Sequence, residues 1–237
     1  MGCLTEGNVK PKRLLELVPE KELGSPSTNG RKLTMSRRTV CCQEKHTPLA
    51  PYKNDIRATW MRKIPLYKDI ITISHGALDV LNILGWKGRI QVCDIDPGVR
   101  EATEYLRGDY PRLNILSPGE SIKDTTIDYC LTYGVKKLGA VDVDLAVGIV
   151  PAWKILAEVL EVLRDFKFHG KVFLTFRNGR DRGFGKAATQ NRINWLWLHL
   201  SLCGVKYVSH TNYRSVRCND NASRSVGSAM CIVELDM

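Results

Sequence analysis

Two aspartates follow an apolar run in the stretch IQVCDIDPGVREATEYL, which covers residues 90–106. Asp94 directly follows the apolar residues, and Asp96 precedes a Pro-Gly pair and a segment with helical spacing. A carboxylate at the end of a buried parallel strand can accept both hydroxyl protons of a nucleotide ribose. A carboxylate before a proline instead caps a helix. The stretch therefore predicts a helix cap at Asp96 and leaves two interpretations of the turn open: a ribose-binding acid at the end of a buried parallel strand, or a surface loop with a capped helix.

A second candidate segment is residues 177–186, which read RNGRDRGFGK. It combines several cations and one aromatic ring with flexible glycines, a composition that suits phosphate binding and base stacking. A solvated surface loop would have the same composition. The candidate substrate-binding residues are Arg177, Arg180, Arg182, Phe184 and Lys186.

Apolar runs alternate with helix-like segments from residue 69 onward, and this alternation must position both candidates. Strands are expected at 70–73, 89–93, 113–116, 141–150, 171–176, 205–209 and 229–235, and helices at 77–84, 99–106, 125–138, 155–166 and 191–202. Buried strands that alternate with helices predict an α/β fold, a Rossmann-like, doubly wound and mostly parallel seven-stranded sheet. The last two strands have no helix between them, which predicts a C-terminal antiparallel hairpin. Ligands of such a sheet bind at the carboxyl ends of its strands.

The order of these elements, the strand ending VCDIDP and the final hairpin resemble the class I S-adenosylmethionine-dependent methyltransferases over roughly residues 68–237. The resemblance implies S-adenosylmethionine as the cofactor. The chain departs from the family after the first strand, where members carry several glycines because the backbone passes close to the cofactor. Here SHGALD keeps one glycine. The cofactor-binding residues that the resemblance implies are Ser74, His75, Gly76, Asp94 and Asp124. By this match Asp94 is the ribose-binding acid. His75 lines the site or is a hydrogen-bonded structural residue, and Asp124 contacts the adenine amino group or is an exposed loop acid.

The resemblance leaves the catalytic residue unknown. Methyltransferases that act on base amino groups carry a polar residue, two prolines and an aromatic residue after the fourth strand, where this chain has VPAW. Trp153 is therefore a candidate stacking platform for a base, or a core residue at a helix start. Ribose methyltransferases use a Lys-Asp-Lys-Glu set, and Glu234 matches its last member. Ile149 and Thr175 stand at the approximate places of the acid and the second lysine, so the match is incomplete.

The net charge of +10 is unevenly distributed along the chain: residues 1–68 carry +8, residues 69–170 carry −4 and residues 171–237 carry +6. Basic ends favour an acidic partner, so RNA or DNA is the first substrate to consider. Residues 1–50 are rich in Lys, Arg, Ser, Pro and Gly, which predicts a basic, disordered tail ahead of a methyltransferase-like domain over 51–237.

Several classes are not expected from the composition. The apolar runs are shorter than the roughly 20 residues of a membrane span, so no membrane partner is expected. The eight cysteines show no C-x-x-C pair and no zinc-site spacing, which predicts no metal and reduced cysteines in an intracellular, cytoplasmic or nuclear protein. The alternative function is a degenerate methyltransferase-like module that binds nucleic acid or a protein partner without catalysis. The methyl acceptor, the oligomeric state and the role of the tail stay open.

Overall fold

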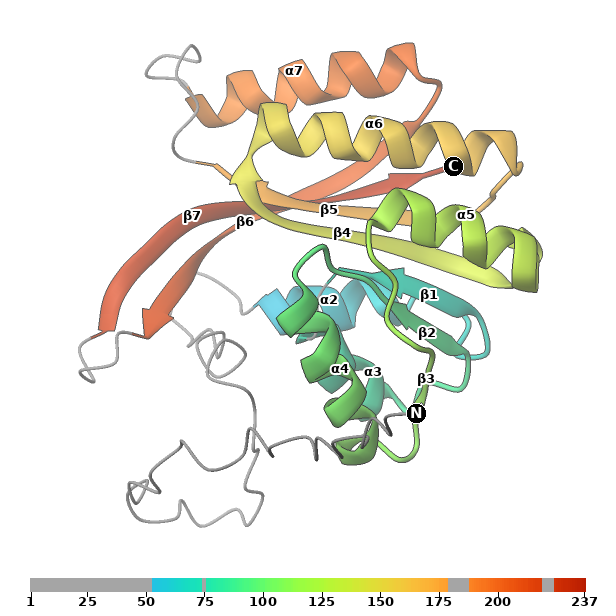
Figure 1. The fold of residues 1–237 in the computed structure, drawn as a ribbon. Helices are drawn as coiled ribbons and strands as arrows, with labels where there is room; N and C mark the ends of the chain where they lie inside the picture. Colours follow the sequence, from blue (N-terminus) through green and yellow to red (C-terminus); the bar gives the residue numbers. More distant parts are fainter. Residues whose placement is uncertain (1–52, 74–75, 179–187, 219–223) are drawn as a thin grey trace, which may run out of the picture. The chain divides into compact units, whose positions relative to one another are not determined.

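A seven-stranded sheet forms the centre of the computed structural model, which describes residues 53–73, 76–178, 188–218 and 224–237. The strand order is β3-β2-β1-β4-β5-β7-β6 (Figure 1). The five parallel strands are β1 (Asp69–Thr72), β2 (Arg89–Val92), β3 (Asn114–Ile115), β4 (Leu138–Gly148) and β5 (Lys171–Arg177). The last two strands, β6 (Lys206–Cys218) and β7 (Arg224–Asp236), pair with each other in antiparallel fashion, and β7 is also antiparallel to β5. The prediction of a Rossmann-like, mostly parallel sheet with a terminal hairpin is confirmed.

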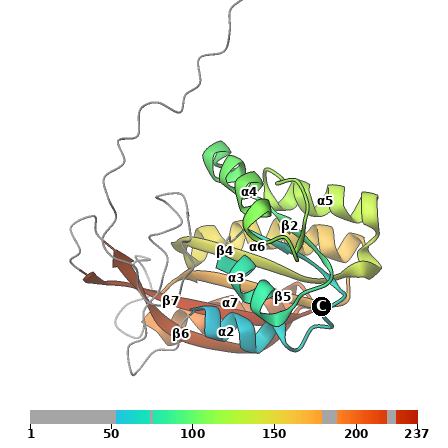
Figure 2. The same cartoon turned by 90° about the horizontal axis from the view of Figure 1, so that it is seen from below.

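Helices cover both faces of the sheet (Figures 1 and 2). One face packs against α2 (Lys53–Met61), α3 (Gly76–Leu84) and α4 (Pro97–Asp109), and the other against α5 (Ile122–Tyr133), α6 (Ile149–Asp165) and α7 (Ala188–Leu202). Each face has its own hydrophobic cluster. The buried strands are apolar on both faces because helices cover both, as parallel sheets require.

Local sequence signals set the ends of α4 and α5. Asp96 caps α4, since its Oδ1 accepts the backbone N–H of Gly98 at 2.9 Å and Pro97 takes the first helical position. The predicted capping role of Asp96 is confirmed. Gly134 ends α5 with a φ of 83°, a conformation that suits glycine, and a short 3₁₀ turn, η1 (Val135–Lys137), follows.

Several elements differ from the expectations drawn from the sequence, among them α5, which ends at Tyr133 rather than at residue 138. Helix α2 was not expected, β4 runs from residue 138 to 148 rather than from 141 to 150, and the hairpin strands extend far into the polar stretch between 211 and 227. Strands of a hairpin are joined by backbone hydrogen bonds, which need no apolar side chains, so a polar sequence can form them.

Two other expectations concern the ends of the chain and the membrane. The predicted tail over residues 1–50 lies outside the described residues, so its division from a domain over 51–237 stays a prediction. Within the ranges that the structure describes, no helix is both long and apolar enough to cross a bilayer.

Candidate functional site at the carboxyl edge of the sheet

The segment that follows β2 is hydrogen-bonded to the end of β1 and to the segment that follows β3, at one edge of the sheet. The backbone N–H of Cys93 donates to the carbonyl of Thr72 at 3.0 Å, and that of Asp94 donates to the carbonyl of Gly119 at 3.1 Å. β1 lies between β2 and β4, and from it the strand order runs in opposite directions. Ligands bind to open α/β sheets at such a switch point, so this edge is the candidate site.

Asp94 lies at this edge, two residues after the end of β2. Its Oδ1 accepts the backbone N–H of Asp96 at 2.8 Å, which holds the side chain, and its own carbonyl accepts from Nη1 of Arg100 at 2.9 Å. The side chain is half-buried, and among the described residues none donates a hydrogen bond to Oδ2. One carboxylate oxygen is therefore available to a ligand.

Asp124 lies in the first turn of α5, a short distance along the chain from the same edge. Its Oδ2 accepts from Oγ of Ser121 at 2.6 Å, and its backbone N–H donates to the same Oγ at 3.1 Å. This reciprocal pair caps α5. The role of Asp124 toward an adenine stays a prediction.

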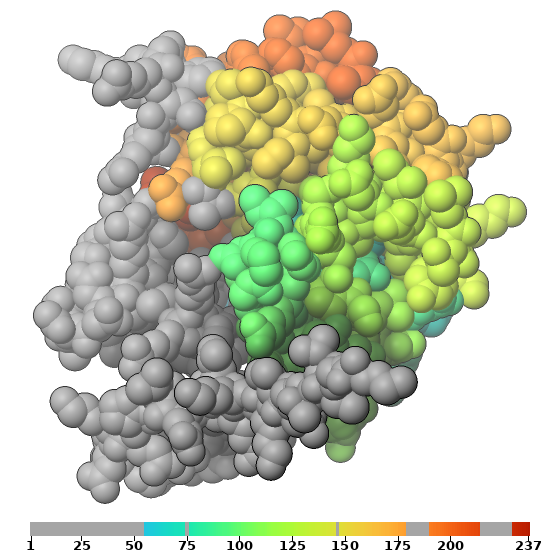
Figure 3. Space-filling view, viewed as in Figure 1, coloured from blue at the N-terminus to red at the C-terminus, as the bar shows by residue number. Residues whose placement is uncertain are grey.

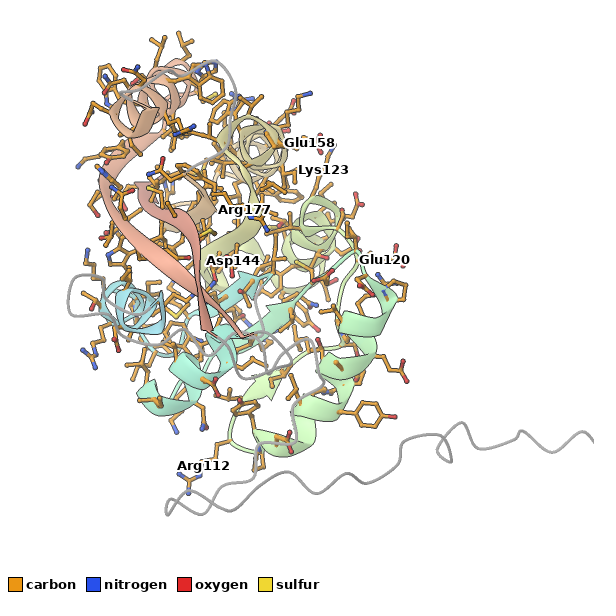
Figure 4. All side chains as sticks on the ribbon, turned by 90° about the vertical axis from the view of Figure 1, so that its left-hand side faces the viewer. Arg112, Glu120, Lys123, Asp144, Glu158 and Arg177 are labelled. Carbon is orange, nitrogen blue, oxygen red and sulfur yellow. The ribbon has the colours of Figure 1, made fainter. Side chains whose placement is uncertain are left out.

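The remaining cofactor-binding and substrate-binding candidates are only partly described. Gly76 is the first residue of α3, directly after the edge, whereas Ser74 and His75 lie outside the described residues. Arg177 is the last residue of β5 and pairs in register with Gly148 of β4 (Figure 4). Both therefore lie at the carboxyl ends of their strands. The other four loop candidates, Arg180, Arg182, Phe184 and Lys186, lie outside the described residues.

The ring of Trp153 packs between two helices. It is in T-shaped contact with Trp195 at 6.3 Å and with His199 at 5.3 Å between ring centroids, and both partners belong to α7. Figure 3 shows α6 and α7 side by side on this face. The contacts favour a packing role over a base-stacking platform, which stays a prediction.

Trp197 and Leu198 of α7 are more exposed than the sequence predicts. Their spacing beside Trp195 suggests the buried face of a helix, but they are 55% and 52% exposed. That interpretation was wrong for these two residues, because the apolar side chains that this helix buries against the core are those of Ile193, Leu196 and Leu200.

Glu234 is buried on β7, away from the end of β5. Its carboxylate lies 2.8 Å from Nζ of Lys63 and 3.0 Å from Nζ of Lys171, the first residue of β5. In register it stands opposite Phe173 rather than Arg177. The structure does not bring Glu234 together with Asp94, and it gives the glutamate two lysine partners instead.

These lysines control the ionisation of Glu234. Burial alone would raise the pKa of Glu234, but hydrogen bonds and charge from Lys63 and Lys171 outweigh burial and hold the pKa below its usual value. Burial likewise opposes the charge on Lys171, yet Asp236 and Glu234 raise the pKa of this lysine overall. Glu234 and Lys171 are therefore both charged at neutral pH.

We expect the cluster to make the stability depend on pH in acid. A carboxylate whose pKa is lowered by folding stabilises the fold above its unfolded pKa of about 4.3, and that contribution is lost as the pH falls through the lower folded pKa. Urea unfolding between about pH 5 and pH 3 should therefore show a steeper loss of stability in the parent chain than in Glu234→Gln. The exposed Glu158, 3.8 Å from Lys123, provides a control in Glu158→Gln, which should keep the parent slope. Parallel curves for all three proteins would contradict the assignment.

A second buried cluster, which the sequence did not reveal, joins α2 to β4. Nη2 of Arg57 lies 2.5 Å from Oδ2 of Asp144, and its Nε lies 3.4 Å from Oδ2 of Asp142. Thr72, the last residue of β1, donates its hydroxyl to the same oxygen of Asp142 at 3.0 Å. The cluster thus lies beside the end of β1.

The burial of this cluster is unusual for so many charges. Arg57 is 3% exposed, Asp142 is fully buried and Asp144 is 12% exposed. Burial would lower the pKa of Arg57, but the two aspartates outweigh it and raise the pKa well above its usual value. The guanidinium therefore stays charged, and two carboxylates share it.

One sequence signal could have indicated the two aspartates. In VDVD, residues 141–144, acids alternate with valines inside an otherwise apolar strand, and a period of two places both acids on one face. Buried acids need a cation. The signal does not say which cation, because Arg57 lies 87 residues from Asp144 along the chain.

Comparisons with known proteins bear on the fold alone. Neither a family model nor a curated protein matches this sequence. Among solved structures, the chain is similar to the precorrin-6y C5,15-methyltransferase of Geobacter metallireducens GS-15, with 14% identity, coverage of 82% of this chain and 94% of that chain, and a TM-score of 0.46. M. jannaschii TYW2, solved in complex with AdoMet, is 12% identical, with 79% and 78% coverage and a TM-score of 0.46. Trm5b of Pyrococcus abyssi is 14% identical, with a TM-score of 0.47. The match covers 81% of this chain and 50% of Trm5b. The fold of this chain is a mostly parallel seven-stranded sheet with a C-terminal antiparallel hairpin.

Proposed function

We propose that this protein is an S-adenosylmethionine-dependent methyltransferase that acts on a nucleic acid. The observation that carries the proposal is the position of Asp94, two residues after the end of β2 at the carboxyl edge of the sheet, where no described residue donates a hydrogen bond to its Oδ2. A carboxylate at this position suits a ribose diol. The α3 helix, which starts at Gly76, follows the neighbouring strand end and would border the rest of the cofactor.

The chain's own contribution to the reaction would be binding and alignment. The cofactor supplies an electrophilic methyl group on a sulfonium ion. Asp94 would hold the ribose and so orient the nucleoside at the edge. The carboxyl ends of β4 and β5, where Gly148 and Arg177 stand in register, would border the methyl acceptor. Alignment of a nucleophile with its target can supply much of a rate enhancement without a strong base.

The proposal of a nucleic-acid substrate is supported by charge. The chain carries +10 overall, and Arg177 ends β5 at the edge that Asp94 occupies. Arginine contacts phosphates through two parallel hydrogen bonds, so an arginine here suits a nucleic-acid backbone.

Two measurements on the full chain test the proposal. Calorimetric titration with S-adenosylmethionine should show binding, and a saturating ligand at 100 times its Kd should add about 2.7 kcal/mol to the unfolding free energy. Incubation with methyl-labelled cofactor and total RNA or DNA should then transfer the label. Absence of a heat of binding at about millimolar cofactor would overturn the proposal. A Kd of about 1 mM corresponds to a binding free energy of only about −4 kcal/mol.

A second candidate function is a binding module without methyl transfer. It is favoured by the contacts of the two catalytic candidates, since Trp153 packs against α7 and Glu234 is held by two lysines. Cofactor binding without label transfer to RNA or DNA would support this alternative.

We also propose an intracellular location. The described cysteines are free thiols, and three of them are buried. Burial raises the pKa of Cys93 and of Cys231 to about 12 and that of Cys130 to about 11, so these thiols stay neutral. Free core thiols are typical of reducing compartments.

A further inference from the structure

A basic pocket lies at the amino-terminal edge of the sheet, where β1, β2 and β4 begin. Its volume of about 370 Å³ falls within the range of small-ligand sites. Asp94 and the proposed cofactor site lie at the other ends of these strands. The lining residues are Tyr67, Lys68, Asp69, Lys87, Gly88, Arg89, Asn114, Lys136 and Lys137, of which five are cations and one is an acid.

The one acid is already engaged. Oδ1 of Asp69 accepts the backbone N–H of Arg89 at 2.6 Å, and its Oδ2 lies 3.3 Å from Nε of the same arginine and accepts from the hydroxyl of Tyr129. The guanidinium of Arg89 also lies 4.1 Å from the ring centre of Tyr133. Asp69 and Arg89 therefore neutralise each other in the floor of the pocket.

The lysines above this floor have no acid to balance them. Lys87, Lys136 and Lys137 are exposed, and none forms an ion pair with any residue in the described part of the chain. Nζ of Lys68 donates to the carbonyl of Lys136 at 2.6 Å, a neutral acceptor that leaves its charge in place. Like charges gathered in one concave site repel, and a bound anion relieves that repulsion.

The backbone holds these lysines close together. The carbonyl of Leu66 accepts the N–H groups of Lys87 and Gly88 at 2.8 and 3.0 Å, which joins the segments before β1 and β2. A Cβ at Gly88 would stand 1.9 Å from the carbonyl oxygen of Lys68, so the close approach of these two segments requires glycine at position 88. The turn after Gly134 then places Lys136 and Lys137 directly before β4. Three separate segments thus converge on one site.

Two uncharged side chains complete the lining. Tyr67 is 72% exposed, which leaves its ring open to solvent. Exposed aromatic rings beside a basic groove stack on nucleobases. Asn114, at the start of β3, adds an amide that can both donate and accept hydrogen bonds.

We infer that this pocket binds the phosphate groups of a nucleotide unit, with the lysines on the phosphates and Tyr67 on the base. The unit comes either from a free nucleoside triphosphate or from a single-stranded nucleic acid. The inference does not depend on methyl transfer, since the site lies at the opposite strand ends from Asp94.

The test uses the full chain and two probes: a fluorescein-labelled single strand of about 15 nucleotides, and ATP. Lys87→Gln/Lys136→Gln/Lys137→Gln should weaken binding about tenfold or more at about 0.1 M salt, and should reduce the slope of log affinity against log salt by about 2 for the single strand. Tyr67→Ala should weaken single-strand binding at least about fivefold with an unchanged salt slope. Affinities come from fluorescence anisotropy and, for ATP, from calorimetry.

A matched control removes the same charge elsewhere. Lys154 and Arg164 on α6 and Lys206 on β6 are exposed and lie outside the pocket lining. The triple glutamine variant at these positions should bind within about twofold of the parent. Equal losses in the two triple variants would overturn the inference, because general charge would then explain the binding. Absence of binding of both probes to the parent chain would overturn it as well.

The two sources and the proposed function are distinguished in the same experiment. If the triple lysine variant loses affinity for ATP and for the single strand alike, a free nucleotide is sufficient for binding at the pocket. If it loses affinity for the single strand alone, the ligand is a nucleic acid. Both outcomes support a phosphate site. The pocket variant should keep the parent's affinity for S-adenosylmethionine and its unfolding midpoint, so failure at this pocket leaves the proposal about Asp94 untouched.

Discussion

Replacing Arg57 with methionine is expected to lower the free energy of unfolding by about 3–5 kcal/mol. The guanidinium is 3% exposed and faces two aspartates, one of them fully buried. Its removal would take away the cation that the two carboxylates share in a largely buried environment. The cost would exceed that of a lost surface ion pair, which is about 0–1 kcal/mol, because the remaining charges cannot regain their hydration.

The destabilisation should depend on the charges that remain. Arg57→Met combined with Asp142→Asn and Asp144→Asn should lose less stability than Arg57→Met alone, since the buried groups are then neutral. Arg62→Met, on an exposed side chain just after α2, is the matched control and should stay within about 0.5 kcal/mol of the parent. Urea unfolding at neutral pH measures all three. A loss below about 1 kcal/mol in Arg57→Met, or a larger loss in the triple variant, would contradict this account of the cluster.

Replacing Asp94 with alanine is expected to weaken S-adenosylmethionine binding about a hundredfold. Each hydrogen bond to a charged group contributes about 1.5–3 kcal/mol, and a carboxylate that accepts from two ribose hydroxyls would contribute about 3 kcal/mol or more. Each 1.4 kcal/mol is about a tenfold change in affinity. The binding free energy from calorimetry measures the effect, and Asp94→Asn should fall between the alanine variant and the parent because an amide oxygen accepts without a charge.

Asp96→Ala is the control for this change, two residues away. Loss of the cap on α4 should cost about 1 kcal/mol of stability, whereas the affinity for the cofactor should change no more than about twofold. The two aspartates would then separate cleanly into a ligand residue and a capping residue. An unchanged affinity in Asp94→Ala, with binding seen in the parent, would show that the cofactor is held by other groups.

Much of the fold could be predicted from local patterns. Buried parallel strands such as β5 read as apolar runs, and the start of α4 carries Asp, Pro and helical spacing. Helix α2 could not be found in this way. It has nine residues, too few to be stable alone, and it depends on tertiary contacts such as the stacking of Trp60 on Phe173 at 5.4 Å between ring centres.

The candidate site likewise combines features that the sequence predicted with features that only the structure shows. The sequence by itself determined that Asp94 closely follows a buried strand and that Asp96 caps a helix, because both positions depend on neighbouring residues. Only the tertiary structure decided that Arg57 neutralises Asp142 and Asp144, that two lysines hold Glu234, and that basic segments before three strands form one pocket. Lys63 and Glu234 are 171 residues apart. Such pairs depend on which strands are neighbours and in what register, and the spacing of residues along the chain does not encode that choice.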